Sequence, residues 1–175
     1  ELIEVEAGDF DGAILLRDKL AKENGWYNTN QFHNPLNIEC HYHTTGEEIV
    51  RACSLLKMTP AAFVSGTGTG GTIMGVARKL KESFPNVKII AVEPAESPVM
   101  SGGEAGLHGI QGIGDGSKFL VDLQQIDEII TVSTDAAKQR TRELIKEDGM
   151  LVGISSGANV FAAEKWIAEN EFDGI

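Results

Sequence analysis

The spacing of apolar residues along the chain predicts five helices. The clearest covers 72–84, where Ile73, Val76 and Leu80 share one face and Pro85 follows, because residues three and four apart lie together on a helix and proline ends one. The same reasoning predicts further helices over 10–23, 44–57, 135–148 and 155–169. The second of these is expected to begin with a capping box at 44–48, TTGEE.

Short apolar runs between these segments predict strands over 2–5, 61–65, 87–92 and 126–132. The segments 26–43 and 96–118 lack a clean period and are expected to be loops. Strands that alternate with helices favour a parallel sheet covered on both faces. We therefore expect an α/β protein, a three-layer sandwich with a mostly parallel sheet. It looks incomplete, because no strand follows the last helix.

Composition then limits the partners. A chain of 175 residues suggests one domain or slightly more. Its net charge of −11 argues against nucleic acid and anionic membranes, which need clustered cations. No apolar stretch approaches the ~18 residues of a membrane span, and the opening ELIEVE is not a signal segment. Two cysteines make no disulfide framework, so we expect a cytoplasmic protein.

The cysteines also bear on metal binding. Cys40, His41 and His43 lie close together and could offer ligands, but no second group stands at a recognisable spacing. A loop without a metal is the expectation here. Cys53 shares helical spacing with Ile49, which predicts a small core residue.

The run GTGTGGT at 66–72 follows a predicted strand and precedes a predicted helix. This arrangement binds phosphate, because glycines let several backbone N–H groups converge and the helix start adds a positive dipole end. The hydroxyls of Thr69 and Thr72 add donors, so no lysine or arginine is required. A turn needed only for tight packing is the alternative.

The kind of phosphate stays open at this point. A nucleoside-triphosphate loop is excluded, because no lysine follows Gly71. Gly66, Gly68 and Gly71 satisfy the dinucleotide fingerprint, and Glu93 ends the next strand where a ribose-binding carboxylate would lie. An NAD(P)-binding oxidoreductase domain, the single phosphate of pyridoxal phosphate, and a non-catalytic fragment that binds a phosphate ligand are the three hypotheses.

Three further motifs accompany this loop. They are QFHNPLN at 31–37 with TTG at 44–46, VEP at 92–94 with SPV at 97–99 and IQGIG at 110–114, and GISSGA at 153–158. Together with SGTGTGGT at 65–72, their order resembles the cysteine synthase (O-acetylserine sulfhydrylase) family, fold-type-II pyridoxal phosphate enzymes that include cystathionine β-synthase. The resemblance covers essentially the whole chain and implies pyridoxal 5'-phosphate as cofactor.

The resemblance also implies roles for single residues. The phosphate cup would consist of Gly68, Thr69, Gly70, Gly71 and Thr72. Ser155, rather than Ser156, would face the pyridine nitrogen, where a neutral hydroxyl suits elimination chemistry; a helix N-cap is its other interpretation. Gln31 would help to bind the substrate α-carboxylate, with an ordinary loop amide as the alternative. Gly112 and Gly114 would line the substrate cleft. Glu93 and His41 would then be structural.

The implied reaction is β-elimination and β-replacement on O-acetylserine or a similar O-activated serine, with sulfide or a thiol as acceptor. The family's Schiff-base lysine and its Asn-Thr-Gly loop belong to an N-terminal segment that these residues do not contain, so no catalytic residue is assigned and the isolated chain is expected to be inactive. GDGSKF at 114–119 replaces the more usual GAGFIP, which leaves the substrate open.

The resemblance finally predicts the domain organisation. Residues 1–28 would be a strand–helix remnant of the family's small domain. Residues 29–175 would be the large pyridoxal phosphate-binding domain without its last strand. The exposed sheet edge and the unpartnered first strand and helix predict a homodimer or a swapped oligomer.

Overall fold

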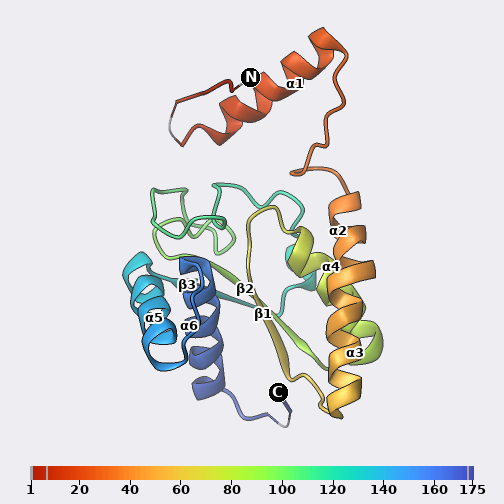
Figure 1. The fold of residues 1–175 in the computed structure, drawn as a ribbon, viewed down its shortest axis with the longest axis vertical. Helices are drawn as coiled ribbons and strands as arrows, with labels where there is room; N and C mark the ends of the chain where they lie inside the picture. The colour runs from red at the N-terminus through yellow and green to blue at the C-terminus, as the bar shows by residue number, and fades with distance from the viewer. Residues whose placement is uncertain (1, 7, 173) are drawn as a thin grey trace.

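The computed structural model describes residues 2–6, 8–172 and 174–175. Its elements, drawn in Figure 1, are α1 (Phe10–Asn24), α2 (Leu36–His41), a π-helical segment (Tyr42–Gly46), α3 (Glu47–Leu56), β1 (Ala62–Gly66), α4 (Gly71–Ser83), β2 (Lys88–Pro94), a 3₁₀ turn (Leu123–Gln125), β3 (Glu128–Val132), α5 (Thr134–Glu147) and α6 (Ile154–Glu169).

Three parallel strands form the sheet among the described residues, in the order β1-β2-β3. Phe63 lies opposite Ile89 in the first pair, and Val92 lies opposite Ile130 in the second. The central strand β2 is buried from its second residue onward. Such a continuous apolar run is typical of a strand with both faces covered. The predicted α/β class with a parallel sheet is confirmed.

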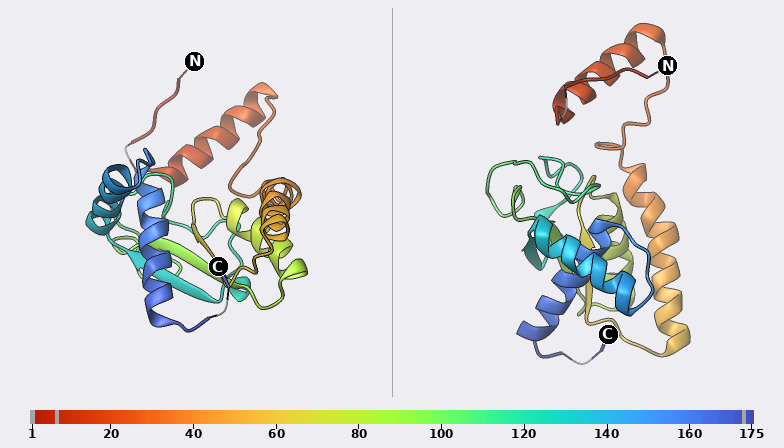
Figure 2. Two further views of the ribbon diagram at one scale, coloured as in Figure 1. Left: turned by 60° about the horizontal axis from the view of Figure 1, so that its bottom comes forward. Right: turned by 60° about the vertical axis from the view of Figure 1, so that its left-hand side comes forward.

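Helices cover both faces of this sheet and create two cores (Figure 2). On one face Ile90, Val92 and Ile130 pack with residues of α5 and α6, among them Ala158 and Trp166. On the other face Ile89 and Ala91 pack with Ile73, Val76 and Leu80 of α4. Neighbouring strand residues point to opposite faces, so β2 contributes to both cores and the molecule has three layers.

The helix predicted over 72–84 is confirmed as α4, and those over 135–148 and 155–169 as α5 and α6. Gly149 follows α5 in a left-handed conformation with φ +68°, which agrees with a glycine that ends a helix. Cys53 is buried in α3, as expected. No helix in the described part of the chain is long and apolar enough to cross a membrane.

The prediction of a loop over 26–43 is wrong from Leu36 onward, where α2 begins. Pro35 does not interrupt the helix but precedes it, a position that proline favours because its missing N–H is not needed there. The Asn34 side chain accepts a hydrogen bond from Leu36 N at 3.0 Å and satisfies one of the free donors of the first turn.

The capping box expected at 44–48 is also wrong. The chain is already helical there and passes through the π-helical segment into α3 without a break. The Thr44 hydroxyl instead donates to the Cys40 carbonyl oxygen at 2.7 Å, one turn back.

The strand predicted over 2–5 does not form. A strand needs a neighbour to pair its backbone N–H and C=O groups, and no other strand lies beside these described residues. The helix predicted over 10–23 is confirmed as α1, which buries none of its described residues and lies apart from the sheet in Figure 1. The described residues among the first 24 therefore add nothing to the two cores.

Candidate cofactor site at the glycine-rich loop

A cavity of about 480 Å³ opens where β1 meets α4. Six of the predicted site residues line it, namely Gln31, Gly68, Thr69, Gly70, Thr72 and Gly112. They come from three segments far apart in the sequence, and the topology brings them together because the loop after β1 lies at the carboxyl edge of the sheet, where ligands bind in parallel α/β proteins. No lysine or arginine is among the described residues that line the cavity.

The loop at 67–70 can approach a ligand closely only because it is glycine-rich. Gly70 has φ +88°, in the left-handed region that glycine adopts readily. A Cβ on Gly68 would lie 2.7 Å from the carbonyl oxygen of Gly112. Helix α4 starts directly after this loop and carries no side-chain cap. Uncapped N–H groups and the positive end of the helix dipole suit an anion such as phosphate.

Gly71 itself is buried and does not line the cavity. Its N–H donates to the Thr69 hydroxyl oxygen at 3.3 Å, and the Asn37 amide occupies the space where a Cβ would lie. Asn37 Nδ2 donates to Thr69 Oγ1 and to the Gln31 carbonyl oxygen, each at 3.0 Å. Gly71 therefore contacts Thr69 and Asn37 rather than the cavity, and its role towards a cofactor stays a prediction.

Thr72 is supported from the neighbouring helix. Its hydroxyl lies 3.2 Å from His41 Nε2, and His41 Nδ1 lies 2.9 Å from the Thr45 hydroxyl. Both ring nitrogens of His41 therefore have protein partners, which agrees with the structural role expected for it. No group of three or more metal-ligating side chains occurs in the described residues.

Ser155 lines neither of the two cavities at this edge of the sheet. It is the second residue of α6, half-buried, and precedes Asn159 by one turn. The Asn159 side chain accepts from the backbone N–H of Gly66 at 2.7 Å, which holds this part of α6 against the end of β1. The N-cap interpretation of Ser155 is wrong, because Gly153 is the N-cap of α6. Its role towards the cofactor stays a prediction.

Gly112 and Gly114 lie on the segment that covers the glycine-rich loop. The N–H of Gly114 donates to the Thr67 carbonyl oxygen at 2.9 Å. Gly114 lines a second cavity of about 650 Å³ beside the first, and Gly112, Phe10 and Asp115 line both. Burial raises the pKa of the Asp115 carboxyl, and positive charge on His108 acts in the opposite direction.

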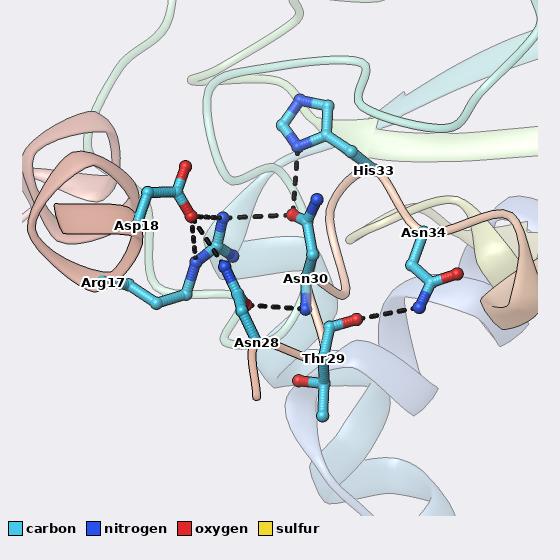
Figure 3. Close-up of polar contacts among 7 residues, drawn as sticks. All are labelled: Arg17, Asp18, Asn28, Thr29, Asn30, His33 and Asn34. Atoms are coloured by element: carbon cyan, nitrogen blue, oxygen red, sulfur yellow. Dashed lines mark hydrogen bonds and ion pairs between the residues drawn. The ribbon is translucent and has the colours of Figure 1, made fainter. Parts of the chain in front are cut away.

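Gln31 lies on a segment that is anchored to α1 by a polar network (Figure 3). Arg17 Nη2 donates to Asp18 Oδ1 at 2.7 Å and to Asn30 Oδ1 at 3.0 Å. Asn28 Nδ2 also donates to Asp18 Oδ1 at 2.8 Å. The hydrogen bond from Arg17 holds the pKa of Asp18 below its usual value. These contacts tie the Gln31 segment to α1, whose first residue, Phe10, lines the same cavity as Gln31.

Glu93 does not face a nucleotide. The residue is 2% exposed, and its carboxylate accepts from Met100 N at 2.7 Å and from Ser101 N at 3.0 Å. The Ser101 hydroxyl donates to the same carboxylate. These bonds use the carboxylate that a dinucleotide ribose would need, and they order the loop after β2 instead.

Sequence reasoning missed Asn37 and Asp115 as residues of this site. Asn37 stands four residues before His41, and this spacing places both on one face of a helix, but the segment was expected to be a loop. Asp115 falls in GDGSKF, where this chain differs from the more usual GAGFIP beside the expected cleft. The sequence therefore marked the position as unusual but did not indicate what its side chain does.

The fold and the site together define an α/β domain whose glycine-rich loop lines a cavity at the start of a helix. Residues 1–174 match the model of a family described as "Pyridoxal-phosphate dependent enzyme", and the chain belongs to this family. Pyridoxal 5'-phosphate is the cofactor of that family, and the NAD(P) and non-catalytic hypotheses receive no support.

Among relatives, a cysteine synthase of Staphylococcus aureus (strain Mu50 / ATCC 700699) is 44% identical over 155 residues, which cover 87% of this chain and 49% of that protein. The crystal structure of the Entamoeba histolytica cysteine synthase is 42% identical with a TM-score of 0.80 and covers 87% of this chain and 45% of that one. A hydrogen sulfide-producing enzyme of Fusobacterium nucleatum is 38% identical with a TM-score of 0.88, over 97% of this chain and 52% of that one. The chain therefore spans about half the length of the curated relatives that it matches.

The residues at the cavity fit the cofactor. The loop leaves no room for a side chain at Gly68, and the start of α4 has no side-chain cap and so suits an anion. Thr69 and Thr72, which each carry a hydroxyl, line the same cavity. This donor set is neutral and suits a single phosphate group.

Proposed function

We propose that this chain contributes the cofactor phosphate cup and part of the substrate cleft of a cysteine synthase-like enzyme. The enzyme would carry out β-elimination and β-replacement on O-acetylserine or a similar O-activated serine, with sulfide or a thiol as acceptor. One observation carries the proposal: the phosphate loop and Gln31 line the same cavity. Similarity to cysteine synthases supports it.

In this proposal each segment has a distinct task. Thr69, Thr72 and the start of α4 hold the phosphate. Gln31 binds the α-carboxylate of the amino-acid substrate, and Ser155 faces the cofactor ring nitrogen. Bound pyridoxal phosphate supplies an electron sink for carbanion chemistry. The described cavity lining holds no lysine, so we place the Schiff-base lysine outside these residues.

We extend the proposal to the organisation of the protein. Residues 1–28 belong to a small domain and residues 29–175 to the large cofactor domain, which agrees with the separation of α1 from both cores. Exposed apolar side chains on α1, such as Leu15 at 71% exposure, support association with a further chain segment or a second copy. Both cysteines are free thiols, which supports a cytoplasmic location.

Equilibrium dialysis of the purified chain tests the cofactor assignment. Pyridoxal phosphate is expected to bind more tightly than pyridoxal, which lacks the phosphate, and NAD is expected not to bind. Thr72→Val removes one donor to a charged group, and such a bond contributes about 1.5–3 kcal/mol, which corresponds to a loss of roughly tenfold or more in affinity. Equal affinity for pyridoxal and pyridoxal phosphate would overturn the assignment.

Mixing experiments test the reaction. Sulfide-dependent formation of cysteine from O-acetylserine is expected when this chain is combined with the N-terminal half of a related cysteine synthase, and not with the chain alone. Turnover by the chain alone would show that the lysine lies within it and would refute that part of the proposal.

A further inference from the structure

The side-chain amide of Asn37 makes contacts in three directions. Its nitrogen uses both protons, one towards the Gln31 carbonyl oxygen and one towards Thr69 Oγ1, each at 3.0 Å. Its oxygen packs against Gly71, in the space that a Cβ would fill. The amide therefore has one orientation, because turning it over would place its oxygen against the Gln31 carbonyl oxygen, and two acceptors cannot form a hydrogen bond.

This orientation determines where the Thr69 hydroxyl can donate. Thr69 Oγ1 accepts from Asn37 Nδ2 at 3.0 Å and from Gly71 N at 3.3 Å. A hydroxyl has two acceptor lone pairs and one proton. With both lone pairs used, the proton is the part of the hydroxyl left for a ligand, and Thr69 lines the cavity.

The support behind Asn37 is rigid. Asn37 lies in the first turn of α2, which packs closely on α4 because Gly75 has no side chain. His41, one turn further along α2, contacts the Thr72 hydroxyl at 3.2 Å. Two residues on one face of α2 thus reach the two threonines of the loop. Groups held by a helix are placed more precisely than groups on a loop.

We propose that Asn37 is a positioning residue of the phosphate cup, which directs the Thr69 hydroxyl proton towards the phosphate. The inference rests on the proposed function, because it takes the ligand to be the phosphate of pyridoxal phosphate. Without the amide donor, a lone pair of Thr69 Oγ1 becomes free and the hydroxyl can rotate, so its donation to the phosphate weakens.

The test compares the binding of pyridoxal phosphate and pyridoxal, measured by equilibrium dialysis with the purified chain. Asn37→Ala is expected to weaken pyridoxal phosphate binding about tenfold, the loss of one hydrogen bond to a charged group, and to leave pyridoxal binding unchanged. Asn34→Ala is the matched control. It also removes two hydrogen bonds of a side-chain amide at the start of α2, one with Leu36 N and one with the Thr29 carbonyl oxygen, but Asn34 makes no hydrogen bond to Thr69. It is expected to preserve the ratio of the two affinities.

A double-mutant cycle separates positioning from general loosening. In a Thr69→Val background, Asn37→Ala is expected to weaken pyridoxal phosphate binding less than about twofold, because its target is gone. An equal loss in both backgrounds, or a change of ratio in Asn34→Ala, would overturn the inference. If Asn37→Ala fails to fold, Asn37→Leu fills a similar volume without N–H donors and without charge, and goes through the same cycle.

The outcomes also separate this inference from the proposed function. An unsubstituted chain with no preference for pyridoxal phosphate over pyridoxal overturns the proposed function, and the inference with it. A clear preference that persists in Asn37→Ala overturns the inference alone.

Discussion

Replacing Gly75 with alanine measures how closely α2 and α4 must pack. Gly75 is buried in α4 where α2 crosses it. A Cβ at this position would lie 2.5 Å from the Ile38 carbonyl oxygen, and 2.8 Å from both His41 Cβ and Tyr42 N. Because carbon atoms in contact are normally about 3.5–4.0 Å apart, the two helices would have to separate by about 0.7 Å or more.

Two opposing terms determine the change in stability. Alanine in a helix is favoured over glycine by about 1 kcal/mol. Overpacking a close-packed interior costs about 1–3 kcal/mol. Two of the three obstructing atoms belong to the backbone and cannot rotate away, so we take the upper part of that range. The expected result is a net loss of about 1–2 kcal/mol in the free energy of unfolding.

Urea unfolding followed by circular dichroism gives this free energy for both proteins. Binding of pyridoxal phosphate is the second readout, and it is expected to weaken because the His41–Thr72 contact at 3.2 Å lengthens when the helices separate. An increase in stability of about 1 kcal/mol is what helix propensity alone predicts. That result would refute the close packing of α2 on α4.

Two more predictions concern single carboxylates. Glu93→Ala leaves the buried N–H of Met100 without its acceptor and also removes the part-buried hydrogen bond from Ser101 N, so a loss of about 2–4 kcal/mol is expected in urea unfolding, and a loss below about 1 kcal/mol would contradict this role. Asp115→Asn is expected to stabilise the protein at neutral pH. Burial raises the pKa of Asp115 in the folded state, so ionisation costs stability as pH rises from the unfolded pKa through the folded one. The gain should vanish near pH 3, below the ordinary aspartate pKa of about 3.9; an equal gain at both pH values would show that charge is not the cause.

Two elements that the sequence predicted correctly, α4 and β2, supply much of the two cores. Ile73, Val76 and Leu80 are buried on one face of α4, and β2 is a continuous apolar run that is buried from its second residue onward. Local pattern and tertiary burial then agree, so the pattern alone is sufficient. A segment without a partner lacks this agreement. The run at 2–5 has the composition of a strand but no partner to pair with.

The start of α2 shows the opposite case. Pro35 and the asparagines around it indicated a loop, yet the proline precedes the helix and Asn34 accepts from its first turn. The helix is stabilised by packing on α4, where partly buried Ile38 lies against the core. This contact joins residues far apart in the sequence, so no local pattern could reveal it.

The sequence by itself determined the class of fold, the glycine-rich loop between a strand and a helix, and the family, because each depends on residue types at short, regular spacing. Only the tertiary structure decided which residues support that loop. Asn37 and Thr69 are 32 positions apart, and Gly66 and Asn159 are 93 positions apart. Such pairs meet because the sheet and its helices bring them together. Hydrogen bonds depend on distance and direction in space, and neither can be derived from the order of residues in the chain.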